Sequence, residues 1–304
     1  IEAYEKAISI KPDYAEAYNN MGNAFQEQAK LKRAVEAFNT ALSIKPELAD
    51  AYWNLSGTSK NIREARHYVL ECLQIDPNHI KAKLTASALD YYEGKEAEFL
   101  SLQKTSLKTA PYMRSFAWTF SLPELPRLYF NRWDLFDGIV ELSKIERPFY
   151  EFGVWRGGSF RYLIRTFKEG FGFDTFGGLP EDWHDTQAGS YSSDGIVPEI
   201  KGGTFISGKF EDTLPIYFAE ERPKASVINF DADLYSSTIC ALTYSHSVID
   251  KHTILIFDEF LMNNDWEQDE YRALNEFCRK YGYIYKVIAI SFFTGQVAVR
   301  LTVV

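Results

Sequence analysis

The amino-acid sequence predicts an all-α helical array followed by a doubly wound α/β sheet that ends in an antiparallel hairpin. Three observations lead to this fold class. The first part of the chain repeats with a period of 34 residues and has apolar positions at helical spacing. The second part alternates short apolar runs, typical of buried parallel strands, with helical segments. Its last two apolar runs flank a short turn, which favours antiparallel pairing.

The repeat is clearest in the first ninety residues. Lys11-Pro12 recurs as Lys45-Pro46, and alanines and aromatic residues recur at the same offset. A third copy is shorter by three residues and ends at Pro77. Small residues let helices approach closely, and a 34-residue period closed by proline resembles the tetratricopeptide repeat (TPR).

The repeat sets the predicted domain boundaries. We expect TPR helices over residues 1–94, a helical linker over 95–145 and the α/β domain over 146–304. Residues 1–11 match the second helix of a repeat, so we expect the sequence to be a fragment with more repeats upstream. The array is expected to bind a protein partner, and a spacer or a homodimerisation element is the alternative.

Composition and charge narrow the function classes. No apolar run reaches the ~18 residues of a membrane span, and no signal peptide opens the sequence. The three cysteines are far apart, which suits a reducing, cytoplasmic location. The net charge of −9 lies in residues 121–304, and this argues against nucleic acid as a partner.

The α/β part is organised around residues 148–159, Pro-Phe-Tyr-Glu-Phe-Gly-Val-Trp-Arg-Gly-Gly-Ser. This stretch predicts a buried strand, a glycine-bearing loop and a helix with Ser159 as its N-cap. Such a unit holds a nucleotide-like cofactor at the carboxyl edge of an open sheet. The glycine spacing differs from G-x-G-x-x-G, which disfavours a nicotinamide cofactor. A glycine turn with a purely structural role is the alternative.

Acidic residues end several of the predicted strands. Asp174 lies 23 residues after Glu151, where an acid can accept both ribose hydroxyls of an adenosine. Asp231 ends one central strand, and Asp258 and Glu259 end its neighbour. Three converging carboxylates with all-oxygen ligation suit Mg²⁺ or another divalent cation. The alternative is that one acid caps a helix and the others are solvated.

Five segments in this order resemble the macrocin O-methyltransferase family, which comprises S-adenosylmethionine (SAM)-dependent enzymes that act on hydroxyls of sugars in natural products. The resemblance covers about residues 145–304 and implies a Rossmann-like class I methyltransferase fold. The segments are Glu-Phe-Gly-Val-Trp-Arg-Gly-Gly-Ser (151–159), Gly-Phe-Asp-Thr-Phe-Gly-Gly-Leu-Pro-Glu-Asp-Trp (172–183), Gly-Lys-Phe-Glu-Asp-Thr-Leu-Pro (208–215), Asp-Ala-Asp-Leu-Tyr-Ser-Ser-Thr (231–238) and Phe-Asp-Glu-Phe (257–260).

The resemblance also implies roles for single residues. The positions that it assigns to the SAM site are Glu151, Gly153, Trp155, Gly157, Ser159, Asp174, Phe210, Glu211, Asp212 and Asp231. Asp231, Asp258 and Glu259 match the positions where related enzymes bind Mg²⁺. Gly177 departs from the family pattern, and the segment between the second and third motifs is short.

Methyl transfer to a small-molecule hydroxyl needs alignment of donor and acceptor and a group that removes the hydroxyl proton. His184, Asp185 and Asp233 are the candidates for that base. A second function remains open: a TPR scaffold whose methyltransferase-like domain binds SAM without turnover.

Overall fold

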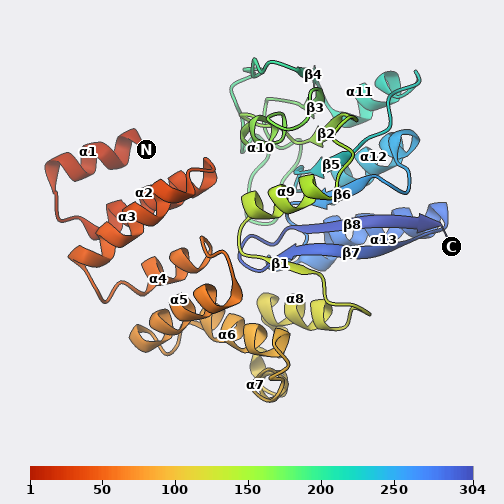
Figure 1. Ribbon diagram of the computed structural model, residues 1–304. Helices are drawn as coiled ribbons and strands as arrows, with labels where there is room; N and C mark the ends of the chain where they lie inside the picture. The colour runs from red at the N-terminus through yellow and green to blue at the C-terminus, as the bar shows by residue number, and fades with distance from the viewer. Residues whose placement is uncertain (304) are drawn as a thin grey trace. The chain divides into compact units, whose positions relative to one another are not determined.

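The computed structural model describes residues 1–303 (Figure 1). The chain divides into two units, of which the first comprises Ile1–Asp134 and Ser291–Thr294, and the second comprises Leu135–Ile290 and Gly295–Val304. None of the described helices combines the length and the apolarity that crossing a bilayer requires.

The first unit is built from helices. Its regular elements are α1 (Glu2–Ile10), α2 (Ala15–Glu27), α3 (Leu31–Ile44), α4 (Ala49–Ser56), α5 (Ile62–Ile75), α6 (Ile80–Tyr92), α7 (Ala97–Leu102), η1 (Ser106–Thr109), α8 (Pro111–Phe120) and the short strand β1 (Arg127–Tyr129). The helix α9 (Arg132–Glu141) leads from this unit into the next.

The predicted repeat corresponds to helix pairs. Helices α2 and α4 start at Ala15 and Ala49, one repeat period apart. The small residues of the pattern are required by close helix contact: a Cβ at Gly22 on α2 would lie 2.4 Å from the Phe38 ring of α3. Phe38 is fully buried in a cluster with Phe25 and Leu55.

The second unit contains the mixed sheet that the sequence predicts. Its strands are β2 (Phe149–Phe152), β3 (Gly170–Asp174), β4 (Gly203–Ser207), β5 (Val227–Phe230), β6 (Ile254–Phe257), β7 (Tyr283–Ser291) and β8 (Val297–Val303). They follow the order β7-β8-β6-β5-β2-β3-β4. Strands β2 to β6 pair in parallel, and β8 is antiparallel to both β6 and β7, so the doubly wound sheet with a terminal hairpin is confirmed.

Helices connect most of the successive strands, whereas residues 175–202 link β3 to β4 without a helix (Figure 1). The connecting helices are α10 (Gly158–Leu163), α11 (Phe210–Tyr217), α12 (Tyr235–Ser245) and α13 (Glu270–Tyr281), with 3₁₀ turns η2 (His246–Val248) and η3 (Trp266–Gln268). The chain starts the sheet at β2, runs outward through β3 and β4, and returns to β5 on the other side of β2. Ligands of open α/β sheets bind at such a switch point, outside the carboxyl ends of the strands.

A row of aromatic rings fixes the register of the central strands. Phe173, Phe152, Phe230 and Phe257 lie side by side on β3, β2, β5 and β6, with ring centroids 5.0, 5.5 and 4.8 Å apart. Because side chains alternate across a strand, the residue before each ring points to the opposite face. That face carries polar groups at the centre of the sheet: Glu151 on β2 lies opposite Asn229 on β5.

Candidate functional site

The strand register brings the predicted acids to one edge. Phe152, Phe230 and Phe257 are partners on adjacent parallel strands, so the residues that follow them leave the sheet at the same level. Backbone hydrogen bonds continue this register by one step: the Asp231 N–H donates to Phe152 O at 2.8 Å, and the Asp258 N–H donates to Phe230 O at 3.0 Å. The switch point of the sheet is therefore lined with carboxylates.

Glu151 is fully buried near the end of β2. The Ser159 hydroxyl donates a hydrogen bond to Oε1, whereas the buried Oε2 makes no hydrogen bond within residues 1–303. Burial raises the pKa of Glu151 to about 8, and the nearby charge of Asp258 adds to the increase, while the bond from Ser159 and a smaller interaction with the Asn229 side chain oppose it. A buried carboxyl oxygen without a partner at a ligand-binding edge is a place where a polar ligand group can be bound.

The glycine loop differs from its predicted form at the start of the helix. Helix α10 begins at Gly158 with Gly157 as its N-cap, at a left-handed φ of 73°. Ser159 therefore lies inside the helix, and the prediction that it is the N-cap is wrong because its hydroxyl is used by Glu151. Gly153 is required by packing: a Cβ there would lie 1.8 Å from the Asp231 carbonyl oxygen. At Gly158 the corresponding position is open, with no atom within 4 Å.

Asp174, at the end of β3, is bonded to the protein backbone. Its Oδ2 accepts the N–H groups of Val154 and Trp155, each at 2.7 Å, and its Oδ1 accepts the Phe176 N–H at 2.7 Å. The carboxylate that was predicted to hold a ribose thus holds the glycine loop and the turn after β3. Part of its hydrogen-bonding capacity is left for a ligand.

We call the sheet edge with Asp231, Asp233, Asp258 and Glu259 the acidic edge. It contains one more carboxylate than the motifs predict. Glu270, the first residue of α13, is fully buried, and its Oε2 accepts the Glu259 N–H at 2.9 Å. Burial raises the pKa of Glu270 well above its usual value, and the charges of Asp258, Glu259, Asp233 and Asp231 add to the increase, in that order. The four predicted acids and Glu270 therefore share one electrostatic environment.

Asp258, at the end of β6, accepts a hydrogen bond from Gln296 of the hairpin. Asp258 is 2% exposed, and Gln296 Nε2 donates to its Oδ1 at 2.7 Å. Gln296 is itself fully buried, and its Oε1 has no hydrogen bond. Glu259 and Asp231 are half-buried, as is Asp233, which has a left-handed φ of 60°.

The structure does not show the predicted metal centre. The donor set of Asp231, Asp258 and Glu259 has the oxygen chemistry that Mg²⁺ prefers. Within residues 1–303, however, no three His, Cys, Asp or Glu side chains are placed so that they could hold a metal ion together. These acids do not fit a metal site as they stand.

The loop after β3 contains the other candidate bases. His184 Nε2 lies 2.8 Å from Asp269 Oδ2, and its Nδ1 lies 3.5 Å from Asp265 Oδ2. Trp183 Nε1 also approaches Asp269, at 3.4 Å. With a carboxylate on each ring nitrogen, His184 is placed to tie its loop to the start of α13. Its neighbour Asp185 is exposed.

The remaining predicted site residues lie around this edge. Phe210 starts α11 and packs edge-on against Phe152, with ring centroids 5.7 Å apart. Glu211 and Asp212 are exposed in the first turn of the same helix. Trp155, in the glycine loop, is 45% exposed and packs edge-on against Tyr191, with centroids 6.1 Å apart.

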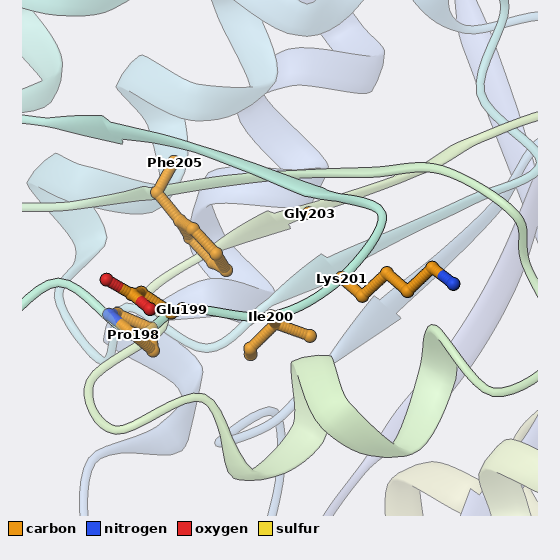
Figure 2. A pocket seen from close by; sticks show the side chains of 6 residues that line it. All are labelled: Pro198, Glu199, Ile200, Lys201, Gly203 and Phe205. Atoms are coloured by element: carbon orange, nitrogen blue, oxygen red, sulfur yellow. The ribbon is translucent and has the colours of Figure 1, made fainter.

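A hollow of about 550 Å³ lies beside the glycine loop at the start of β4. Its lining residues are Pro198, Glu199, Ile200, Lys201, Gly203 and Phe205 (Figure 2). In Figure 2 the Phe205 ring extends toward the 198–200 segment. Ile200 and Pro198 also pack toward Gly157, where a Cβ would lie 3.0 and 3.4 Å from their side chains. This segment thus supports the glycine loop from the side of β4.

Sequence reasoning missed three buried polar residues of the site, Asn229, Glu270 and Gln296. Asn229 interrupts the apolar run of β5, and a polar residue inside a buried strand is a signal that could have identified it. Glu270 and Gln296 belong to α13 and to the segment before β8, and only the fold brings them to the acids.

Comparison with protein families finds a repeat at the start of the chain. The TPR repeat family model matches residues 1–29. A comparison of the sequence with curated proteins finds no match.

Similar solved structures include methyltransferases. The O-methyltransferase NovP is 21% identical, with 56% of this chain and 78% of that chain covered and a TM-score of 0.43. CalS11, a calicheamicin methyltransferase, is 19% identical, with 68% and 92% covered and a TM-score of 0.45. An O-methyltransferase from Bacillus cereus in complex with SAH is 13% identical, with 56% and 78% covered and a TM-score of 0.36. Because these TM-scores are low, the fold assignment rests on the strand order described above.

Proposed function

We propose that the second unit is a SAM-dependent O-methyltransferase of the macrocin type, acting on a hydroxyl of a sugar or natural-product-like small molecule. The observation that carries this proposal is the placement of Glu151. Its buried Oε2 makes no hydrogen bond among the described residues and lies at the switch point of the sheet, beside the carboxylates that end β5 and β6. The Glu151 carboxylate can bind a cationic methyl donor. The neighbouring carboxylates of the acidic edge can bind the hydroxyl of an acceptor.

The chain offers a fitting set of groups for the cofactor. Glu151 Oε2 is available for the methionine ammonium, and the open space at Gly158 leaves room beside the loop. Asp174 has remaining acceptor capacity for a ribose hydroxyl, and Phe210, Glu211 and Asp212 lie where the adenine is proposed to bind. When bound, SAM supplies a methyl group on a sulfonium, which passes to the acceptor oxygen and leaves S-adenosylhomocysteine.

The acidic edge then performs the remaining chemistry. As the O–CH₃ bond forms and the S–CH₃ bond breaks, the hydroxyl proton must pass to a base. Asp231 and Asp233 are half-buried at the switch point, and both suit this role. The left-handed backbone of Asp233 is the kind of strain that collects at functional sites. His184 is the weaker candidate, because both of its ring nitrogens face carboxylates.

Metal assistance is a separate proposal. A divalent cation at Asp231, Asp258 and Glu259 requires these side chains to move together from their present positions. Calorimetric titration with Mg²⁺ in the presence of SAM tests it. Full methyl transfer in excess EDTA contradicts a role for the metal.

We propose that the helical array of the first unit binds a protein partner or a second copy of the chain. The repeat itself supports this, because stacked helix pairs present extended binding surfaces. Light scattering of the purified chain distinguishes the two, since a dimer doubles the molar mass.

The function is tested in two steps. Calorimetry with SAM and, separately, with NAD tests cofactor choice, and binding of NAD without SAM contradicts the proposal. Release of S-adenosylhomocysteine is then measured with a panel of free and glycosidically linked sugars, with and without Mg²⁺. Tight SAM binding without release for any acceptor favours the alternative, a TPR scaffold that binds SAM without turnover.

A further inference from the structure

Asp174 is bonded to three backbone N–H groups from two different loops. Val154 and Trp155 donate from the glycine loop to Oδ2, and Phe176 donates from the turn after β3 to Oδ1. All three donor–acceptor distances are 2.7 Å, at the short end of the range for N–H groups that donate to a carboxylate. A single side chain therefore joins the ends of β2 and β3.

Two of these three donors have a backbone conformation that a non-glycine residue rarely adopts. The φ angles are 49° at Trp155 and 57° at Phe176. Such conformations persist where the surrounding structure determines them. The hydrogen bonds to the Asp174 carboxylate are the interactions that hold both amides in these positions.

Trp155 and Phe176 are also hydrogen-bonded to a second loop. The Phe176 carbonyl oxygen accepts the Ser193 N–H at 3.2 Å and the Gly195 N–H at 2.9 Å. The Trp155 indole N–H donates to the Ser192 carbonyl oxygen at 3.2 Å. Residues 191–195, which begin with the exposed ring of Tyr191, are thus attached to the two residues that Asp174 fixes.

We propose that Asp174 is a positioning residue that fixes the glycine loop and the 191–195 loop before any cofactor binds. Its link to methyl transfer rests on the proposed function, because these loops flank the proposed SAM and acceptor sites. A carboxylate offers about four lone-pair positions, and three are in use. The main role of this acid is therefore to preform the site, and one position is left for a ribose hydroxyl.

Amide hydrogen exchange of the cofactor-free chain, followed residue by residue by NMR, tests this directly. In the unsubstituted chain the Trp155 and Phe176 amides should exchange far more slowly than unprotected peptide amides. Asp174→Asn keeps the size of the side chain and replaces one acceptor oxygen with a donor. It should accelerate exchange at these amides about 10- to 100-fold, the range expected for losing hydrogen bonds to a charged group. Exchange at the Ser193 and Gly195 amides should also accelerate.

Asp194→Asn is the matched control, since Asp194 is an exposed acid in the second loop with a similar left-handed φ of 56°. It should leave exchange at Trp155 and Phe176 unchanged. Two results overturn the proposal: unprotected exchange of these amides in the unsubstituted chain, or unchanged exchange in Asp174→Asn together with weaker SAM binding, which would make Asp174 a ribose ligand alone. A chain that does not bind SAM, yet loses protection in Asp174→Asn, contradicts the proposed function and leaves the positioning role supported.

Discussion

Replacing Glu151 by glutamine should change how the stability of the second unit depends on pH. Burial raises the pKa of the folded-state carboxyl to about 8 from an ordinary value of 4.5. Between these two values the folded chain keeps a proton that the unfolded chain releases. The folded state therefore loses stability as the pH rises through this window, by about 1.4 kcal/mol per pH unit. Over the whole window the loss amounts to roughly 5 kcal/mol.

Glu151→Gln removes this titration and keeps the geometry. The glutamine carbonyl oxygen still accepts the hydrogen bond from the Ser159 hydroxyl, and the side chain has nearly the same volume. Other groups with shifted pKa values, such as His246, whose pKa is lowered by burial, are present in both proteins. Their contributions cancel in the difference between the two stability curves, and the slope that remains belongs to Glu151.

Native-state hydrogen exchange of the β5 amides measures this difference, because the slowest amides of a buried strand report the global opening of their unit. The glutamine variant should gain stability relative to the unsubstituted chain as the pH rises from 5 to 8. Ser159→Ala provides a second test, since it removes a hydrogen bond that favours the charged form of Glu151. The pKa of Glu151 should therefore rise further, and the pH range over which stability is lost should extend upward. If the free energy of unfolding changes with pH in the same way in the unsubstituted chain and in Glu151→Gln, the reasoning is refuted.

Three further predictions follow from the site. SAM affinity, measured by calorimetry, should rise with pH toward 8 by up to about tenfold per unit, because Glu151 must release its proton to bind an ammonium, and Glu151→Gln should show no such rise. Gln296→Leu should destabilise the second unit by about 1.5–3 kcal/mol in urea unfolding, since the buried Asp258 loses the hydrogen bond from Gln296, and an unchanged midpoint contradicts this. Gly153→Ala should prevent folding of the second unit, as judged by circular dichroism, whereas Gly158→Ala, at an open position, should fold normally.

The fold was predictable because its signals are local in sequence. The central strands are buried on both faces, so Ile254–Phe257 reads as an apolar run without alternation, and Val227–Phe230 does so except at Asn229. In the first unit, the repeat period reappears as the spacing of helix starts. The predicted N-cap at Ser159 failed because N-cap propensity ignores a competing partner, and the buried Glu151 carboxyl is that partner.

The site was predictable only in part. Acids that follow apolar strands can be placed at one edge from the sequence, since parallel strands end at the same edge. Sequence reasoning does not show how each carboxylate is satisfied. Asp174 is surrounded by backbone N–H groups that no motif encodes, and Glu270 reaches Glu259 only because α13 starts beside the end of β6. These contacts depend on the turns between elements, and sequence patterns say least about turns.

Two of the carboxylates assigned to the same cofactor have different environments, and the difference suits two tasks. Asp174 accepts three backbone N–H hydrogen bonds, and these bonds hold the loops in position. Glu151 accepts a hydrogen bond from the Ser159 hydroxyl and lies beside the Asn229 side chain, but its burial outweighs both and raises its pKa. A positively charged ligand group at Oε2 would stabilise the charged form of Glu151 and lower that pKa. In the proposed site, the acid that positions the loops and the acid that would bind a positive charge are therefore different residues, on the neighbouring strands β3 and β2.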